Sequence, residues 1–359
     1  MLLGSGYPQR VDVWSLGVRG ARVIDQRLVN PDGERCWLPG VECMWRQNGV
    51  WDLNQQGEPH LLRPDHFSQI DGKPVDVSRD YFNPFANRYA RAIREVFLDT
   101  LIFLESDPRN GQIHWGDSNE DEVVFAPHWY DGYGLFLKDF KSFIAFDVDT
   151  DKLVFGQHRI RKSFAEQLGR LKQFARTMMG DVPTLIGVFG IAFDLNNRRA
   201  YRTRDFRSQI AALDRSMRAM EDNLLSCTLW NYTADNDNQH GDQWNGEDLS
   251  IFSRNQQDNP ADIHSGGRAL DAAVRPYPIA VAGEPIRLEF DIRDKQFAFE
   301  FHHDPDVTAP TEIYVPSLQY PAGFQVILSD GTYSYAAETQ TLRYMHDPSV
   351  RWHTIQIRP

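Results

Sequence analysis

The fold of this chain is decided by the segment Pro183-Thr184-Leu185-Ile186-Gly187-Val188-Phe189-Gly190-Ile191-Ala192-Phe193-Asp194. Its apolar residues do not alternate with polar ones, which is typical of a strand buried on both faces of a sheet. Gly187 and Gly190 bracket the end of the strand, and an acidic loop follows. In a parallel α/β barrel, the chemistry is found at the carboxyl ends of the strands. We therefore expect the end of this segment to contribute to the functional site.

Strands and helices alternate around this segment. The other apolar strands are short, and we predict them at 100–105, 122–131 and 224–231. The helices show an apolar stripe at helical spacing, and we predict them at about 84–96, 163–179 and 205–222. Ser163 and Glu166 are interpreted as the capping box of the second helix. Buried strands joined by helices indicate a parallel sheet covered by helices, and so an α/β fold.

The pattern changes near residue 275. Apolar and charged residues then alternate strictly from Ile286 to Ile292, and Phe297, Phe299 and Phe301 alternate with Ala298 and Glu300 in a second strand. A period of two indicates an antiparallel sheet. Further short strands are predicted near 312–316, 324–329, 341–346 and 352–358. We interpret 280–359 as a C-terminal antiparallel β-sandwich domain. Residues 1–275 form the other predicted domain, in which 1–80 is a long irregular loop region with little periodicity.

Composition narrows the possible functions. The 359 residues carry a net charge of −12, which argues against a nucleic-acid partner held by phosphate neutralisation. The three cysteines are irregularly spaced, so neither a disulfide framework nor a zinc site is expected. No apolar run is long enough to span a bilayer. The first ten residues lack the pattern of a signal peptide, and a cytoplasmic location is the default expectation.

Candidate metal and cofactor motifs are incomplete. The run Asp147–Asp151 begins like a calcium-binding loop, but Lys152 and His158 stand where that loop needs Gly and Glu. We expect a solvated turn there. His302 and His303 are neighbours on a predicted strand, so their rings point to opposite faces. With no phosphate-binding glycine loop and no nucleophile-elbow serine, no metal and no cofactor is predicted.

Four blocks of sequence together resemble glycoside hydrolase family 5, in the branch of endoglycoceramidases and glucosylceramide-cleaving enzymes. They are 126–131, 184–194, 229–233 and 241–253, and they occur in the family's order. The resemblance implies a (β/α)8 TIM barrel followed by a C-terminal β-sandwich. We expect this chain to hold roughly the second half of that barrel, with strands five to eight and their helices over 84–255.

The resemblance also implies where the catalytic residues belong. Family members carry Gly-Glu-Phe-Gly at the seventh strand, where Glu is the nucleophile, and Asn-Glu-Pro at the fourth, where Glu is the acid/base. Here Val188 occupies the nucleophile position, and Asn-Glu-Pro does not occur. A retaining glycosidase needs two carboxylates about 5 Å apart, and valine has no lone pair to offer. No intact catalytic residue is therefore expected.

By resemblance, His128 and Tyr130 are substrate-side groups, and Trp230 lies under the reactive sugar. Trp244 is a candidate for the cleft rim, with a structural loop as the alternative. The acids near the same face are Glu105, Asp131 and Glu247. They are possible cleft acids, but they could instead orient neighbouring groups by hydrogen bonds.

Three functional hypotheses follow. The first is a family 5 glycosidase homologue for a β-glucoside or glycolipid, inactive in this chain because both catalytic carboxylates are missing. The second is a non-catalytic carbohydrate-binding protein. The third is a truncated fragment without independent function, or one completed by a separate N-terminal half-barrel. Half a barrel leaves parallel strand edges unpaired, which predicts poor solubility of the isolated chain.

Overall fold

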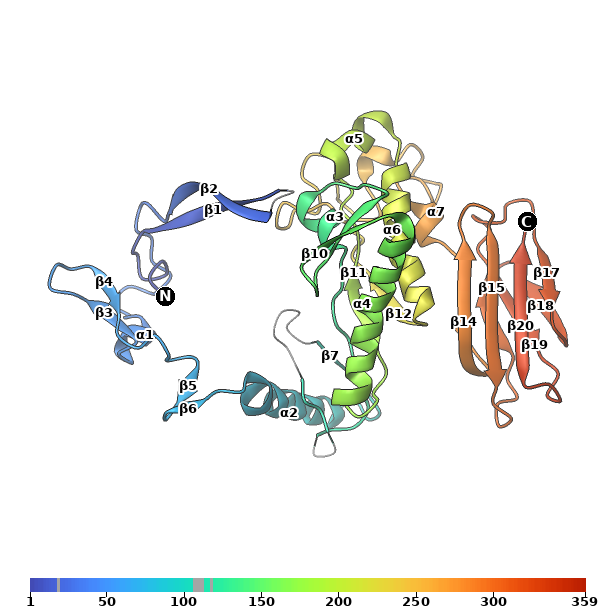
Figure 1. Ribbon diagram of the computed structural model, residues 1–359, viewed down its shortest axis with the longest axis horizontal. Coiled ribbons are helices and arrows are strands. Elements are labelled where there is room, and N and C mark those ends of the chain that lie inside the picture. Colours follow the sequence, from blue (N-terminus) through green and yellow to red (C-terminus); the bar gives the residue numbers. More distant parts are fainter. Residues whose placement is uncertain (18–19, 106–112, 117–118) are drawn as a thin grey trace. The chain divides into compact units, whose positions relative to one another are not determined.

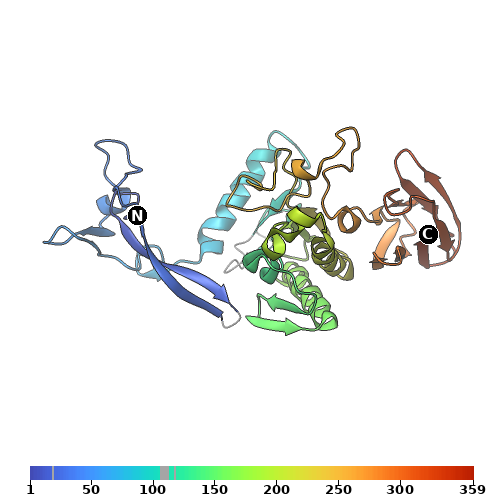
Figure 2. The same cartoon turned by 90° about the horizontal axis from the view of Figure 1, so that it is seen from above.

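The computed structural model describes residues 1–17, 20–105, 113–116 and 119–359. Contacts along the chain divide it into two compact units, Met1–Phe85 and Ala86–Pro359. Figures 1 and 2 show the elements of both units in two views. Each unit is described by itself.

The N-terminal unit contains three antiparallel hairpins and a short helix. The strands are β1 (Gln9–Gly17), β2 (Gly20–Val29), β3 (Trp51–Leu53), β4 (Pro59–Leu61), β5 (Gln69–Ile70) and β6 (Lys73–Pro74), and α1 spans Met44–Gln47. A small core forms around Cys43, Val50 and Trp51. The expectation of an irregular loop over 1–80 is therefore wrong for β1 and β2, the long ribbon in Figure 1. The alternation of polar and apolar residues from Arg10 to Ser15 was the missed signal.

In the described part of the second unit, four parallel strands lie at the predicted places. They are β7 (Ile102–Leu104), β8 (Val123–Phe125), β11 (Leu185–Phe189) and β12 (Ser226–Leu229). β7 pairs with β8, and β11 pairs with β12. Parallel bridges from Phe125 to Thr184 and from His128 to Val188 join the two pairs. The order β7-β8-β11-β12 follows the sequence, as expected when consecutive parallel strands are neighbours.

Helices separate these strands. The α-helices are α2 (Asn83–Arg94), α3 (Gly132–Leu137), α4 (Gln157–Met178), α5 (Leu195–Thr203), α6 (Arg207–Asp222) and α7 (Leu270–Ala273). A π-helical turn at Ser78–Phe82 precedes α2, and a 3₁₀ turn spans Arg254–Gln256. α4 and α6 pack side by side (Figure 1). Phe164 and Leu168 of α4, with Leu213 of α6, are fully buried in one core with Ile186 and Phe189 of β11.

The capping box predicted at Ser163 is wrong, because α4 begins six residues earlier at Gln157. Ser163 lies inside the helix, and its hydroxyl donates a hydrogen bond of 2.7 Å to Asp147. Asp147 is the last residue of β9 (Ile144–Asp147). This strand forms a hairpin with β10 (Lys152–Phe155), which was not predicted. The predicted turn at 147–151 connects these two strands, and the Asp147 carboxylate accepts backbone hydrogen bonds within it.

The C-terminal region contains two four-stranded antiparallel sheets. The first has the order β14-β15-β20-β17 and the second β13-β16-β19-β18. The strands are β13 (Tyr277–Ala280), β14 (Gly283–Asp291), β15 (Gln296–His303), β16 (Thr311–Tyr314), β17 (Gln325–Leu328), β18 (Thr332–Ala336), β19 (Thr341–Met345) and β20 (Trp352–Arg358). One buried cluster draws Phe299 and Ile355 from the first sheet and Ile313 and Leu342 from the second. β13 and β18 were missed, and the other six strands were predicted.

A buried arginine joins α6 to the first of these sheets. Arg275 donates hydrogen bonds to Asp214 at 3.1 Å and to Glu221 at 3.0 Å, both on α6. It also donates to the backbone carbonyl of Phe290 on β14 at 3.2 Å. Breaking a buried charge pair by removing one partner is strongly destabilising, so this contact fixes the helix against the sheet.

Two glycines allow β11 to lie close to its neighbours. A Cβ atom at residue 187 would lie 2.8 Å from the carbonyl oxygen of Ala126, next to β8. A Cβ atom at residue 190 would overlap the carbonyl oxygen of Trp230, next to β12. Both obstacles are backbone atoms, which cannot rotate away as a side chain can. The strand therefore needs glycine at both positions.

We expect Gly190→Ala to lower the free energy of unfolding by about 1–3 kcal/mol or more, because the added methyl group must displace backbone. Urea denaturation of the purified variant measures this change. Gly116→Ala is the matched control, since no atom lies within 4 Å of its Cβ position. Equal unfolding midpoints for the two variants would contradict the close packing of β11 against β12.

Candidate active site

Four residues lie at the same edge of the parallel sheet. Glu105 directly follows β7, His128 lies three residues after β8, Val188 lies near the end of β11 and Trp230 directly follows β12. Because the four strands are parallel neighbours, their carboxyl ends lie at one edge. This is the edge at which barrel enzymes place their chemistry.

His128 and Glu105 form a direct contact across β7 and β8. The Nε2 atom of His128 lies 3.0 Å from Oε1 of Glu105. Both side chains are partly exposed, so the pair adds little to stability. The contact instead orients the imidazole ring of His128 at the edge of the sheet. Glu105 is thus engaged with His128, in agreement with the alternative that it orients a neighbouring group.

Val188 is held in place by its backbone. It forms a parallel bridge with His128, and its carbonyl oxygen accepts a hydrogen bond of 2.9 Å from the amide of Trp129. Its side chain is partly buried. An isopropyl group at this point has no lone pair and no charge, so it cannot attack an anomeric carbon or stabilise a developing cation.

Tyr130 is a partly buried hydrogen-bond donor. Burial raises the pKa of its hydroxyl, and the negative charge of Glu247 raises it further. The phenol therefore stays protonated at ordinary pH. Glu247, which exerts this effect, belongs to the loop that follows β12.

Asp131 has a structural role in the fold. Its side chain is only 8% exposed and caps the N-terminus of α3 by accepting a 3.0 Å hydrogen bond from the amide of Tyr133. Burial raises the pKa of Asp131, and the positive charge of Arg215 opposes that rise. The capping position and the burial agree with the alternative in which this acid organises its neighbours.

Two tryptophans expose their rings. Trp230 is 41% exposed and Trp244, in the following loop, is 62% exposed. The amide of Trp230 donates a 2.7 Å hydrogen bond to Phe189 of β11, and the peptide bond that follows it is cis. An exposed flat ring offers an apolar face with a polar edge, which suits the face of a sugar.

The loop that carries Trp244 and Glu247 is anchored by a buried ion pair. Arg268 is fully buried and approaches Asp248 to 2.6 Å. Asp248 also accepts hydrogen bonds from Asn236 and from the hydroxyl of Tyr201. Sequence reasoning missed this anchor, because the spacing of Asp248 and Arg268 matches no local motif.

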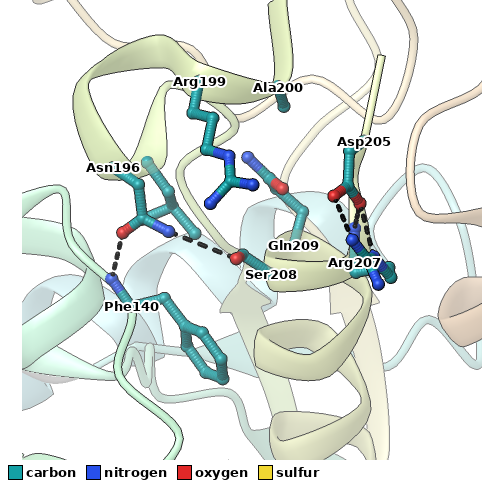
Figure 3. A pocket seen from close by; sticks show the side chains of 9 residues that line it. Phe140, Asn196, Arg199, Ala200, Asp205, Arg207, Ser208 and Gln209 are labelled. Carbon is teal, nitrogen blue, oxygen red and sulfur yellow. Dashed lines mark hydrogen bonds and ion pairs between the residues drawn. The ribbon is translucent and has the colours of Figure 1, made fainter. Parts of the chain in front are cut away.

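A cavity of about 250 Å³ lies at the starts of α5 and α6. Figure 3 shows Asn196 between Phe140 and Ser208, with an ion pair between Asp205 and Arg207 on the opposite side. The strand-end residues are not among those that line this cavity. In the part of the chain that the structure describes, the cavity is therefore separate from the candidate active site.

Two further features concern metal binding and membrane spanning. Within the described ranges, the side chains close enough together to share a metal ion lie in the C-terminal sheets and not at the strand ends. Across those same residues, no helix combines the length and apolar character that crossing a membrane requires.

The C-terminal region matches a known domain. Residues 275–357 match the model of the glycoside hydrolase family 5 C-terminal domain. These residues cover the two antiparallel sheets almost completely. In this chain a parallel sheet, with polar and aromatic groups at its carboxyl edge, precedes the matched domain. This combination relates the chain to the glycoside hydrolases.

Relatives extend the match over the whole chain. A glucosylceramidase of Rhizopus delemar is 32% identical over 376 residues, which cover 96% of this chain and 54% of that protein. The crystal structure of Cryptococcus neoformans sterylglucosidase 1 is 28% identical with a TM-score of 0.87, covering 100% of this chain and 58% of that one. Endo-glycoceramidase II from Rhodococcus sp. shares the fold, with a TM-score of 0.55, 17% identity, and coverage of 82% of this chain and 57% of that one.

The resemblance seen in the sequence is thus confirmed. The chain is a homologue of glycoside hydrolase family 5, in the branch that contains glucosylceramidases, sterylglucosidases and endoglycoceramidases. It spans about half the length of the curated relatives that it matches, with coverages of 54%, 46% and 57% of the first three.

The structural role of Asp131 predicts a difference between two substitutions. Asp131→Ala removes the cap of α3 and should lower the free energy of unfolding by about 0.5–2 kcal/mol. Asp131→Asn should retain most of the stability, because asparagine caps a helix as well as aspartate does. Urea unfolding monitored by circular dichroism compares the two. Identical losses would show that capping is not what Asp131 contributes.

Proposed function

We propose that this chain is the carboxyl-terminal part of a β-glucosidase fold for glycolipids, and that it does not hydrolyse its substrate. The proposed barrel portion contains strands five to eight, which correspond to β7, β8, β11 and β12. The names of the relatives, glucosylceramidase and ergosteryl-β-glucosidase, support a glucoside with a lipid aglycone as the ligand class.

One observation carries the proposed inactivity: Val188 stands at the end of β11, backbone-paired with His128. Retaining hydrolysis needs one carboxylate to attack the anomeric carbon and a second to protonate the leaving oxygen. Loss of a catalytic nucleophile can lower the rate by a factor on the order of 10⁶, judged from other covalent enzymes. Glu105 is a poor replacement, because it belongs to β7 and is paired with His128.

The remaining groups still suit recognition of a sugar. His128 and Tyr130 offer polar contacts, while the exposed rings of Trp230 and Trp244 offer apolar faces. Glu247 adds a hydrogen-bond acceptor beside Tyr130. In this proposal these residues bind the substrate and none of them forms a covalent intermediate.

Activity on 2,4-dinitrophenyl β-glucoside tests the proposed inactivity, because this leaving group departs without help from an acid. We expect no turnover by the pure chain above a control without enzyme. Val188→Glu restores a carboxylate and should exceed Val188→Gln, which has nearly the same size but no charge, by at least about tenfold. Turnover by the unsubstituted chain would refute the proposed inactivity.

A non-catalytic carbohydrate-binding protein is the second candidate, favoured by the exposure of Trp230 at the strand ends. Calorimetric titration with octyl β-glucoside below its micellar concentration should then give a measurable heat. Trp230→Ala should weaken binding by up to about tenfold, the equivalent of one good ring contact. Trp14→Ala removes a more exposed ring from the N-terminal unit and serves as the control. Absence of heat at millimolar glucoside would exclude this candidate.

The third possibility is that a separate N-terminal half-barrel completes the sheet. Among the described residues, β7 and β12 are the outer strands of the parallel sheet, and each has a strand partner on one side only. An unpaired strand edge is a template for pairing with another chain. A half-barrel that supplies the first four strands would cover both edges and could bring the missing acid/base.

A further inference from the structure

Three histidines from different strands of the C-terminal sheets lie close together. His303 ends β15, His346 directly follows β19 and His353 lies in β20. One ring nitrogen from each lies within 4.8 Å of those of the other two. Since β15 and β20 belong to one sheet and β19 to the other, the cluster bridges the two sheets.

The rings are closely packed and incompletely hydrogen-bonded. Nδ1 of His303 lies 3.0 Å from Nε2 of His353. The ring centre of His346 lies 4.6 Å from that of His353 and 4.8 Å from that of His303. The Nδ1 atom of His346 is buried and has no hydrogen-bond partner. A buried polar atom without a partner is uncommon and calls for a ligand or another explanation.

Asp330 sets the orientation of His353. Its Oδ2 atom lies 2.8 Å from Nδ1 of His353, which is fully buried. The carboxylate also accepts hydrogen bonds from Ser329, from Tyr344 and from the amide of Asp347.

The hydrogen bonds of Asp330 determine which nitrogen of His353 carries the proton. Both oxygens of Asp330 accept from other donors, so Nδ1 of His353 is also a donor to this carboxylate. Nε2 is then left with a lone pair that points toward His303. A carboxylate that accepts from one nitrogen of a histidine while the other faces a metal ion is the usual outer shell of a histidine ligand.

We propose that His303, His346 and His353 bind a divalent transition-metal ion of the zinc type, with Asp330 as the residue that positions His353. Zinc binds imidazole nitrogen at about 2.0–2.1 Å in a tetrahedral arrangement, which places ligand nitrogens about 3.3 Å apart. The separations in the cluster, from 3.0 Å to less than 4.8 Å, bracket that value. Water would complete the coordination.

Binding requires one change of protonation. His303 donates its Nδ1 proton to His353 in the described arrangement, so that proton must move to Nε2 of His303 when the ion binds. The imidazoles remain neutral, as metal ligands must be. Because the ligands come from both sheets, the ion would cross-link them and stabilise the C-terminal region.

Sequence spacing did not indicate this site. His302 and His303 were set aside because neighbouring strand residues face opposite sides, and the structure agrees, since the His302 ring packs against Trp352. The partners of His303 come from positions 43 and 50 residues further along the chain. Only the pairing of β15 with β20, and the position of β19 in the second sheet, bring the three together.

Calorimetric titration of the full chain with ZnCl₂, after removal of metals with EDTA, tests the proposal. We expect about one ion per chain and a higher melting temperature in the presence of zinc, because the ion binds only the folded state. CoCl₂ should give the visible absorption of a tetrahedral site. No stoichiometric binding, or an unchanged melting temperature, would overturn the proposal.

Variants separate this site from adventitious binding by other histidines. His346→Asn removes no hydrogen bond at Nδ1, so it should fold normally yet lose at least about 100-fold in affinity for zinc. Asp330→Asn should weaken binding by about 10–100-fold, as loss of an outer-shell partner does. His302→Asn, one residue away on the opposite face, is the control and should bind as the unsubstituted chain does. Equal losses in His302→Asn and His346→Asn would overturn the assignment.

Discussion

The site depends on the close approach of β11 to the strands on either side. Glycine at 187 and 190 removes the side chains that would strike the backbone of Ala126 and Trp230. As a result, residue 188 lies between the groups contributed by β8 and β12. His128, Val188 and Trp230 thus owe their proximity to backbone packing. The side chain at 188 can therefore differ without disturbing the sheet.

The backbone that positions residue 188 is thus independent of the side chain at that position. Strand pairing and the hydrogen bond from Trp129 hold Val188 by its main chain, and neither requires a carboxylate. Around it, Glu105 orients His128, and the loop after β12 is fixed by the buried pair of Arg268 and Asp248. These interactions keep polar and aromatic side chains together at the carboxyl edge of the parallel sheet.

Much of the fold could be predicted because its signals are local. The four parallel strands are short apolar runs, and the C-terminal strands alternate with a period of two. Predictions were less accurate where local signals compete. The Ser163 pattern matched a capping box, yet Gly156 allows α4 to begin at Gln157, and Ser163 bonds to Asp147 instead. Asp131, a possible cleft acid in the sequence, also caps α3, which its local sequence did not indicate.

The sequence by itself indicated the family resemblance and the places of the parallel strands, because both are carried by short runs of consecutive residues. Tertiary structure alone decided which distant side chains meet. The pairing of His128 with Glu105, the buried contact of Arg268 with Asp248 and the contacts of His303 with His346 and His353 join residues 20 to 50 positions apart. The physical reason is that strand pairing and sheet packing, and not local periodicity, bring these groups within bonding distance.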